Sequence, residues 1–126
     1  MPVSRLALAI LLSVVAFAPT TAQPSGSALT IDIANFSFSP KPIHLVAGKP
    51  VTLTLANRAG GGHDFTAKEF FAASTITAGA APGGKIELEG HETKTITLIP
   101  RAGTYQAHCS HFLHASMGMT DEIVVN

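Results

Sequence analysis

Residues 108–119 read HCSHFLHASMGM and contain the one cysteine of the 126-residue chain. Four residues separate Cys109 from His114, and four more separate His114 from Met119. A thiolate, an imidazole and a thioether therefore lie in one short loop. Sulfur ligands favour Cu(I), imidazole binds both oxidation states, and two His with one Cys and a weak axial Met form the blue-copper electron-transfer geometry. The spacing predicts a copper site, one ion per chain, in which Met119 or Met117 supplies the thioether.

A trigonal site of this kind needs a second histidine from another part of the chain. The best candidate is His63, in the stretch Gly60-Gly61-Gly62-His63-Asp64-Phe65. The alternative site is the run of His108, His111 and His114, which could hold zinc or weakly bound copper. In a strand followed by a loop, that spacing converges on one metal less well than Cys109, His114 and Met119 do. The remaining histidines, His44 and His91, are expected at the surface.

At these residues the sequence resembles the small blue-copper cupredoxins of the plastocyanin and azurin group. The ligand spacing is similar to that of rusticyanin-like members, and the resemblance extends over residues 29–126. It includes the weaker segments Phe36-Ser37-Phe38-Ser39-Pro40 and Val46-Ala47-Gly48-Lys49-Pro50. The resemblance implies that His63, Cys109, His114 and Met119 are the copper ligands.

The resemblance also implies roles for neighbouring residues. His114 is expected at the surface, where it passes electrons to redox partners through an apolar patch that includes Phe112 and Leu113. Ser110 is expected to form a hydrogen bond with residue 64 and so to brace the two ligand segments. Relatives often have Asn at that position, whereas this chain has Asp64. An ionised carboxylate cannot donate, so the brace must reverse its polarity or use a backbone N–H. Relatives also often have Pro-Gly before the loop histidine, and here those residues are Phe112 and Leu113.

Residues 1–22 are predicted to be a secretory signal peptide. Arg5 gives a positive start, residues 6–18 are apolar but short for a membrane span, and residues 20–22 offer a small-residue cleavage site. The alternative is an uncleaved N-terminal anchor. Residues 23–28 are predicted to be a linker, and residues 29–126 a single copper-binding domain. A periplasmic or secreted location follows, in which a lone cysteine favours a metal thiolate.

The domain is predicted to be all-β, a Greek-key sandwich. Apolar and polar residues alternate over several short segments bounded by turn residues. These predicted strands are residues 29–33, 36–38, 43–46, 51–55, 86–89, 93–98, 102–109 and 122–125.

One segment departs from the strand pattern. Residues 66–74 favour a short helix or an irregular excursion by propensity, and residues 78–84 favour a flexible loop. Phe65, Phe70 and Phe71 lie in or beside this segment. They either shield the copper site or belong to the ordinary core.

Two functions are compatible with these ligands. The first is a one-electron carrier that shuttles between exported redox proteins, which would dock near His114. The second is a periplasmic Cu(I)-binding protein for copper delivery, storage or resistance. An enzyme is not expected, because no second metal cluster or nucleophile motif is recognisable and a four-ligand site has no open position. The formal net charge of zero gives no sign of nucleic-acid binding. We expect a monomer with no membrane span after signal cleavage.

Overall fold

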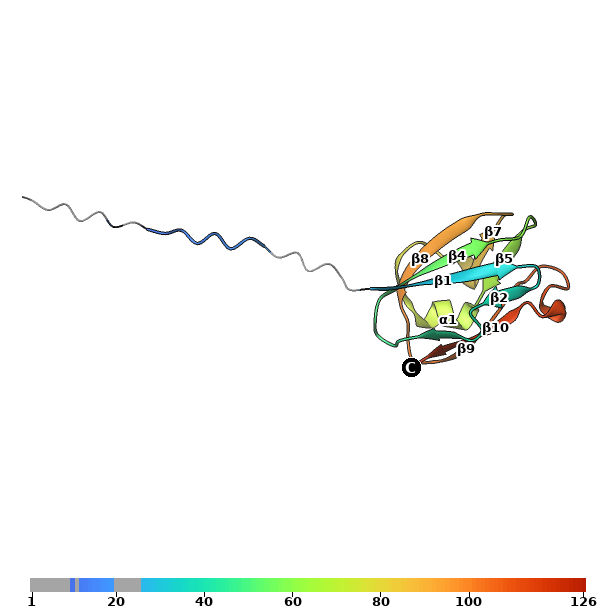
Figure 1. Ribbon diagram of the computed structural model, residues 1–126. Helices are drawn as coiled ribbons and strands as arrows, with labels where there is room; N and C mark the ends of the chain where they lie inside the picture. Colours follow the sequence, from blue (N-terminus) through green and yellow to red (C-terminus); the bar gives the residue numbers. More distant parts are fainter. Residues whose placement is uncertain (1–9, 11, 20–25) are drawn as a thin grey trace, which may run out of the picture.

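The computed structural model describes residues 10, 12–19 and 26–126 (Figure 1). The predicted cleavage site and half of the predicted linker, residues 23–25, lie outside these residues. Residues 12–19 have no regular secondary structure, and their apolar side chains are exposed. Among the described residues, no helix has the length and apolar character needed to cross a membrane.

Two five-stranded sheets form the folded part of the chain (Figure 1). In spatial order, the first sheet contains β2 (Ser37–Ser39), β1 (Ser27–Ala34), β4 (Val51–Asn57), β8 (Thr93–Ile99) and β6 (Thr75–Ala78). The second contains β3 (Ile43–Leu45), β10 (Thr120–Val125), β9 (Gly103–His108), β5 (His63–Thr66) and β7 (Lys85–Leu88). Both sheets are mixed, because β1 pairs in parallel with β4 and β3 pairs in parallel with β10. The predicted all-β Greek-key sandwich is confirmed.

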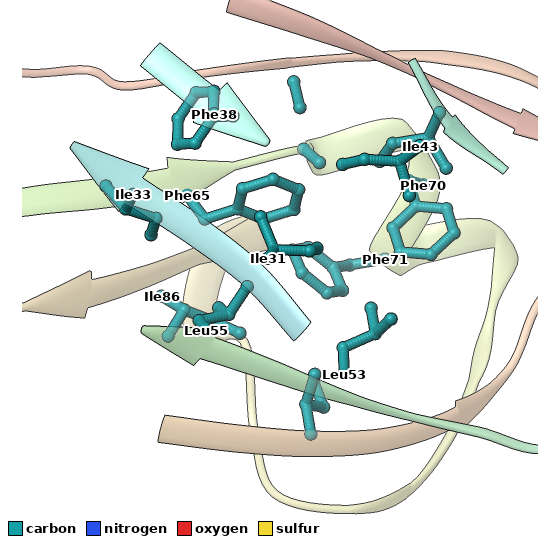
Figure 2. Packing of buried hydrophobic residues seen from close by; sticks show 14 of the residues in the cluster. Ile31, Ile33, Phe38, Ile43, Leu53, Leu55, Phe65, Phe70, Phe71 and Ile86 are labelled. Carbon is teal, nitrogen blue, oxygen red and sulfur yellow. The ribbon is translucent and has the colours of Figure 1, made fainter. Parts of the chain in front are cut away.

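Alternating side chains build the core between the sheets. In β4, Val51, Leu53 and Leu55 are buried, while the threonines between them are partly exposed. Figure 2 shows Leu53 and Leu55 packed among the inward side chains of β1 and β5. The predicted strands are confirmed, and their ends differ from the observed ends by two residues or fewer.

Two strands were not predicted. All four side chains of β5 are buried, so its sequence shows no alternation. All four side chains of β6 are exposed at the edge of the first sheet. Part of the predicted loop over residues 78–84 is a short 3-10 turn, η1 (Pro82–Gly84).

The predicted short helix is confirmed as α1 (Lys68–Ala73). Six residues without a side-chain cap are too few to form a stable helix alone. Tertiary packing therefore stabilises it: the Phe70 ring lies 5.6 Å from that of Tyr105, and the Phe71 ring lies 6.1 Å from that of Phe65. All three phenylalanines belong to the buried core cluster (Figure 2).

The loop between β4 and β5 is fixed from both sides before it reaches His63. The Asn57 amide donates to the carbonyls of Gly61 and Glu89, each at 2.9 Å, and its oxygen accepts from the Ala59 N–H at 3.0 Å. The turn after β7 contacts the same loop at Gly90, where an added Cβ would lie 2.0 Å from the Gly60 carbonyl oxygen. Glycine is required at this position because the Gly60 backbone occupies the space that a side chain would need.

We predict that Gly90→Ala displaces the loop before His63 and lowers the free energy of unfolding by about 1–3 kcal/mol, the usual range for overpacking. Gly61→Ala is the matched control, since its Cβ would meet nothing within 4 Å. Urea unfolding of both variants measures the difference. Equal stability of the two variants would contradict the packing described here.

Candidate metal centre

The two predicted ligand segments meet at one end of the second sheet (Figure 1). His63 is the first residue of β5, and Cys109 follows the last residue of β9. The two strands pair antiparallel at Thr66 and His108, the last residue of each, so β5 runs alongside the segment that follows β9. The loop from Cys109 then turns through η2 (Ala115–Met117) and returns as β10.

Three of the four predicted ligands lie together. His63 Nδ1 and His114 Nδ1 are 3.1 Å apart. Cys109 Sγ lies 3.9 Å from the first of these nitrogens and 3.4 Å from the second. The side chains of His63 and Cys109 are fully buried, whereas His114 is partly exposed. These residues form one of the described groups whose donor atoms all lie within 4.8 Å of one another.

This donor set fits a copper ion. Zinc–ligand bonds of about 2.0 Å to nitrogen and 2.3 Å to sulfur indicate the scale of such a site, and a trigonal plane then separates its donors by about 3.5–3.7 Å. The three observed separations of 3.1, 3.4 and 3.9 Å bracket that range. Two imidazoles and one thiolate are the in-plane ligands of a blue-copper site.

The turn between β1 and β2 contacts both histidines. Asn35 Oδ1 lies 2.9 Å from His63 Nε2 and accepts its hydrogen, which leaves the Nδ1 lone pair facing Cys109. The Phe36 ring packs edge-on against His114, with centroids 5.2 Å apart. Sequence analysis placed Phe36 in a weak family segment and in the predicted strand 36–38, and it missed Asn35. Nothing in the sequence around Asn35 gave a sign of its contact with His63, 28 positions along the chain.

Hydrogen bonds fix both the sulfur and the backbone of the buried Cys109. The Asp64 N–H donates to the sulfur at 3.4 Å. The Cys109 backbone N–H donates to the Met119 carbonyl at 3.1 Å. Burial raises the pKa of the Cys109 thiol, and the backbone N–H groups of Asp64 and His111 offset only part of that rise. The metal-free thiol is therefore protonated at neutral pH. Metal binding must release that proton.

Burial also keeps His63 neutral. It lowers the pKa of His63, and the neighbouring His114 and His111 rings lower that pKa further. In the metal-free chain, His63 Nδ1 therefore accepts a hydrogen from His114 Nδ1.

The predicted brace between Ser110 and Asp64 is present, with reversed polarity. The Ser110 N–H and hydroxyl donate to the two carboxylate oxygens, at 2.9 and 2.5 Å. The Thr66 hydroxyl donates to the same carboxylate at 2.7 Å. Burial alone would raise the pKa of Asp64, but these hydrogen bonds outweigh it and hold the pKa below its ordinary value. The ionised carboxylate thus joins β5 to the ligand loop.

The two loop methionines and the remaining histidines differ in burial and in their distance from the three donors. Met119 is fully buried, whereas Met117 is 56% exposed. The His111 and His114 rings are 5.3 Å apart, but His108 belongs to no three-donor metal group among the described residues. His44 and His91 are exposed, as expected.

Residues 6–125 match the family model described as a cupredoxin-like domain. The chain belongs to the cupredoxin-like family. No curated protein matches its sequence at the significance level used.

Solved structures resemble this cupredoxin in fold. Auracyanin B is 17% identical, with a TM-score of 0.58, and the match covers 85% of this chain and 93% of that one. The multicopper oxidase McoA from the hyperthermophile Aquifex aeolicus is 15% identical, with a TM-score of 0.63 over 90% of this chain. The match covers only 32% of that oxidase, so it concerns part of a much longer protein.

We predict that Asn35→Leu lowers copper affinity by about 10- to 100-fold, the usual effect of losing a hydrogen bond behind a ligating histidine. The leucine cannot accept from His63 Nε2, so the ring loses its fixed orientation. Competition with a chromogenic Cu(I) chelator measures the affinity. Ser37→Ala in the exposed part of the same hairpin is the control, and equal affinities would show that Asn35 has no such effect.

We predict that Asp64→Asn lowers the free energy of unfolding of the metal-free protein by about 1–3 kcal/mol at pH 7. A carboxylate whose pKa is depressed by folding stabilises the protein above its unfolded pKa of about 3.9, and this contribution is lost as the pH falls through the folded pKa. The variant should therefore show a weaker acid dependence than the parent.

The control for Asp64 is Asp32→Asn, which removes an exposed ion pair with Arg58 at 2.7 Å. Such pairs contribute about 0–1 kcal/mol. Urea unfolding of the variants from pH 3 to pH 7 compares their stabilities over a range that includes the unfolded carboxyl pKa of about 3.9. Parallel pH profiles for the parent protein and Asp64→Asn would exclude the brace as a source of stability.

Proposed function

We propose that this cupredoxin is a one-electron carrier with a single type 1 copper ion held by His63, Cys109, His114 and Met119. The observation that supports the proposal most directly is the convergence of three donors, 3.1 to 3.9 Å apart, in the metal-free fold. Because hydrogen bonds already orient His63 and the Cys109 loop, little rearrangement is needed to bind a metal. A fixed site of this kind suits a carrier, since its geometry changes little between oxidation states.

Bound copper supplies the Cu(II)/Cu(I) couple. The chain contributes the surroundings that tune this couple: a buried thiolate, an N–H bond to that sulfur from Asp64, and a buried Met119 as the weak axial ligand. The side chains of His63 and Cys109 are themselves buried, so water has little access to these two donors. A closed set of four donors supports a carrier in preference to an enzyme.

Electron exchange with partners is proposed at His114. Its ring is partly exposed, and the surrounding loop presents Phe112, Leu113 and Met117, which are 87%, 56% and 56% exposed. Leu113 has a φ of +64°, a region that non-glycine residues rarely adopt. The Leu113 carbonyl accepts hydrogen bonds from the Ser116 hydroxyl at 2.8 Å and the Met117 N–H at 3.1 Å, which hold this turn with the Leu113 side chain exposed. An apolar patch around a redox ligand suits brief docking with redox proteins.

Export is part of the proposal. Residues 1–22 would be removed as a signal peptide, and the mature monomer would work in the periplasm or outside the cell. The exposed apolar side chains of residues 12–19 support this, since they add nothing to the core.

A copper-handling role is the second candidate. His111 stacks against His114, and the exposed Met117 lies on the same loop, so two further donors for copper flank the site. Soft and imidazole donors near the surface would help Cu(I) pass to an acceptor protein.

An optical spectrum separates the two functions. We predict that Cu(II) added to the purified mature protein gives an intense visible thiolate-to-copper band, which is lost in Cys109→Ser. The band should bleach and return on reduction and reoxidation. A colourless protein that binds only Cu(I) would favour copper handling and overturn the carrier.

A pair of methionine variants tests the axial ligand. We predict that Met119→Leu retains the visible band but changes the reduction potential, because the axial ligand tunes the metal without forming the plane. Met117→Leu should change neither property. Protein-film voltammetry measures both potentials, and the reverse pattern would assign the axial position to Met117.

A further inference from the structure

His111 lies at the rim of the metal centre and has no part in the proposed carrier site. Its Nε2 is 2.6 Å from Glu87 Oε1 and 3.7 Å from Asp64 Oδ2. The His111 side chain is 32% exposed and that of Glu87 is 52% exposed, so solvent reaches both. This imidazole therefore faces two carboxylates at the surface.

These three side chains come from a fixed framework. Asp64 and Glu87 are directly opposite each other in the β5–β7 register, and His111 follows Cys109 by two residues. Asp64, Cys109 and His111 form the second described group whose donor atoms lie within 4.8 Å of one another. Cys109 thus belongs to two groups, one completed by the imidazoles of His63 and His114 and the other by the Asp64 carboxylate and the His111 imidazole.

Asp64 retains coordinating capacity despite its role as a brace. A carboxylate has about four lone-pair positions. Thr66 and the Ser110 N–H donate to Oδ1, whereas only the Ser110 hydroxyl donates to Oδ2, the oxygen nearer His111. One position on Oδ2 is therefore available. Glu87 belongs to neither described donor group, and its exposed side chain would rotate toward Asp64 to share a ligand.

The charges favour a dication at this rim. In the reduced carrier, the Cys109 thiolate would balance the single charge of Cu(I). The carboxylates of Asp64 and Glu87 then carry two further negative charges beside His111. One imidazole and two carboxylates form a borderline-hard donor set that suits Cu²⁺ or Zn²⁺ better than Cu(I).

We propose that His111, Glu87 and Asp64 form a second metal position for a divalent cation, and that Cu(II) reaches the buried donors through it. The entry role rests on the proposed copper function, whereas the position itself does not. If His111 and Glu87 form only an ion pair that holds the loop, the first experiment below will detect no bound Zn²⁺ and the second will detect no change in rate.

The first experiment is calorimetric titration of Zn²⁺ into the copper-loaded protein at neutral pH. Copper binds more tightly than zinc to such ligands, so the buried donors stay occupied. We expect one Zn²⁺ to bind per chain. The affinity for Zn²⁺ should fall about tenfold or more in His111→Gln and in Glu87→Gln, a loss at least as large as that caused by removing a residue that supports a metal ligand. His91→Gln and Glu89→Gln remove exposed residues of the same types as controls.

The outcomes are separable. No Zn²⁺ binding, or equal binding by the parent and His111→Gln, would overturn the second position. The visible band reports independently on the buried donors. Zn²⁺ binding that is weakened in His111→Gln but not in Cys109→Ser, by a protein that never develops the band, would contradict the proposed carrier and leave the second position intact.

The second experiment is stopped-flow mixing of Cu(II) with the metal-free protein. We expect His111→Gln to slow growth of the visible band by about tenfold or more with an unchanged final amplitude, since entry and not the final site is altered. Glu89→Gln should match the parent. An unchanged rate, or a lower amplitude at an unchanged rate, would overturn the entry route.

Discussion

The metal centre depends on one buried carboxylate. Asp64 accepts hydrogen bonds from Thr66 on its own strand and from Ser110 on the ligand loop. Its own N–H meanwhile donates to Cys109 Sγ. A single residue therefore fixes the distance between the segment that carries His63 and the segment that carries the thiol. Without it, two chain segments 46 positions apart would be joined at this end by strand pairing, packing and the His63–His114 contact.

The rest of the sandwich positions this junction. The paired β5 and β9 bring the two ligand segments together, and the glycine contact at Gly90 fixes the loop that precedes His63. The β1–β2 turn, from the opposite sheet, reaches across with Asn35 and Phe36. Both histidine rings are thus restrained by residues outside their own segments. A site restrained in this way has its donors in place before a metal arrives, which is the property that a carrier requires.

Much of this could be predicted from the sequence, because local patterns encode it. Alternation identified most strands, and the spacing of Cys109, His114 and Met119 identified the loop as a metal site. The pattern failed where both faces of a strand are buried, as in β5, or both exposed, as in β6. The long-range partners could not be predicted: Asn35 looks like an ordinary turn residue, and Glu87 looks like an outward residue of an alternating strand. Only folding brings the first to His63 and the second to His111.

The central claim is that the fold brings His63, Cys109 and His114 to one metal ion. X-ray absorption at the copper edge of the copper-loaded protein tests it most directly, because the fine structure reports the atoms bound to the metal. We predict one short copper–sulfur bond and two imidazole nitrogens, with the sulfur bond absent in Cys109→Ser. A shell of nitrogen and oxygen atoms without sulfur would contradict the account.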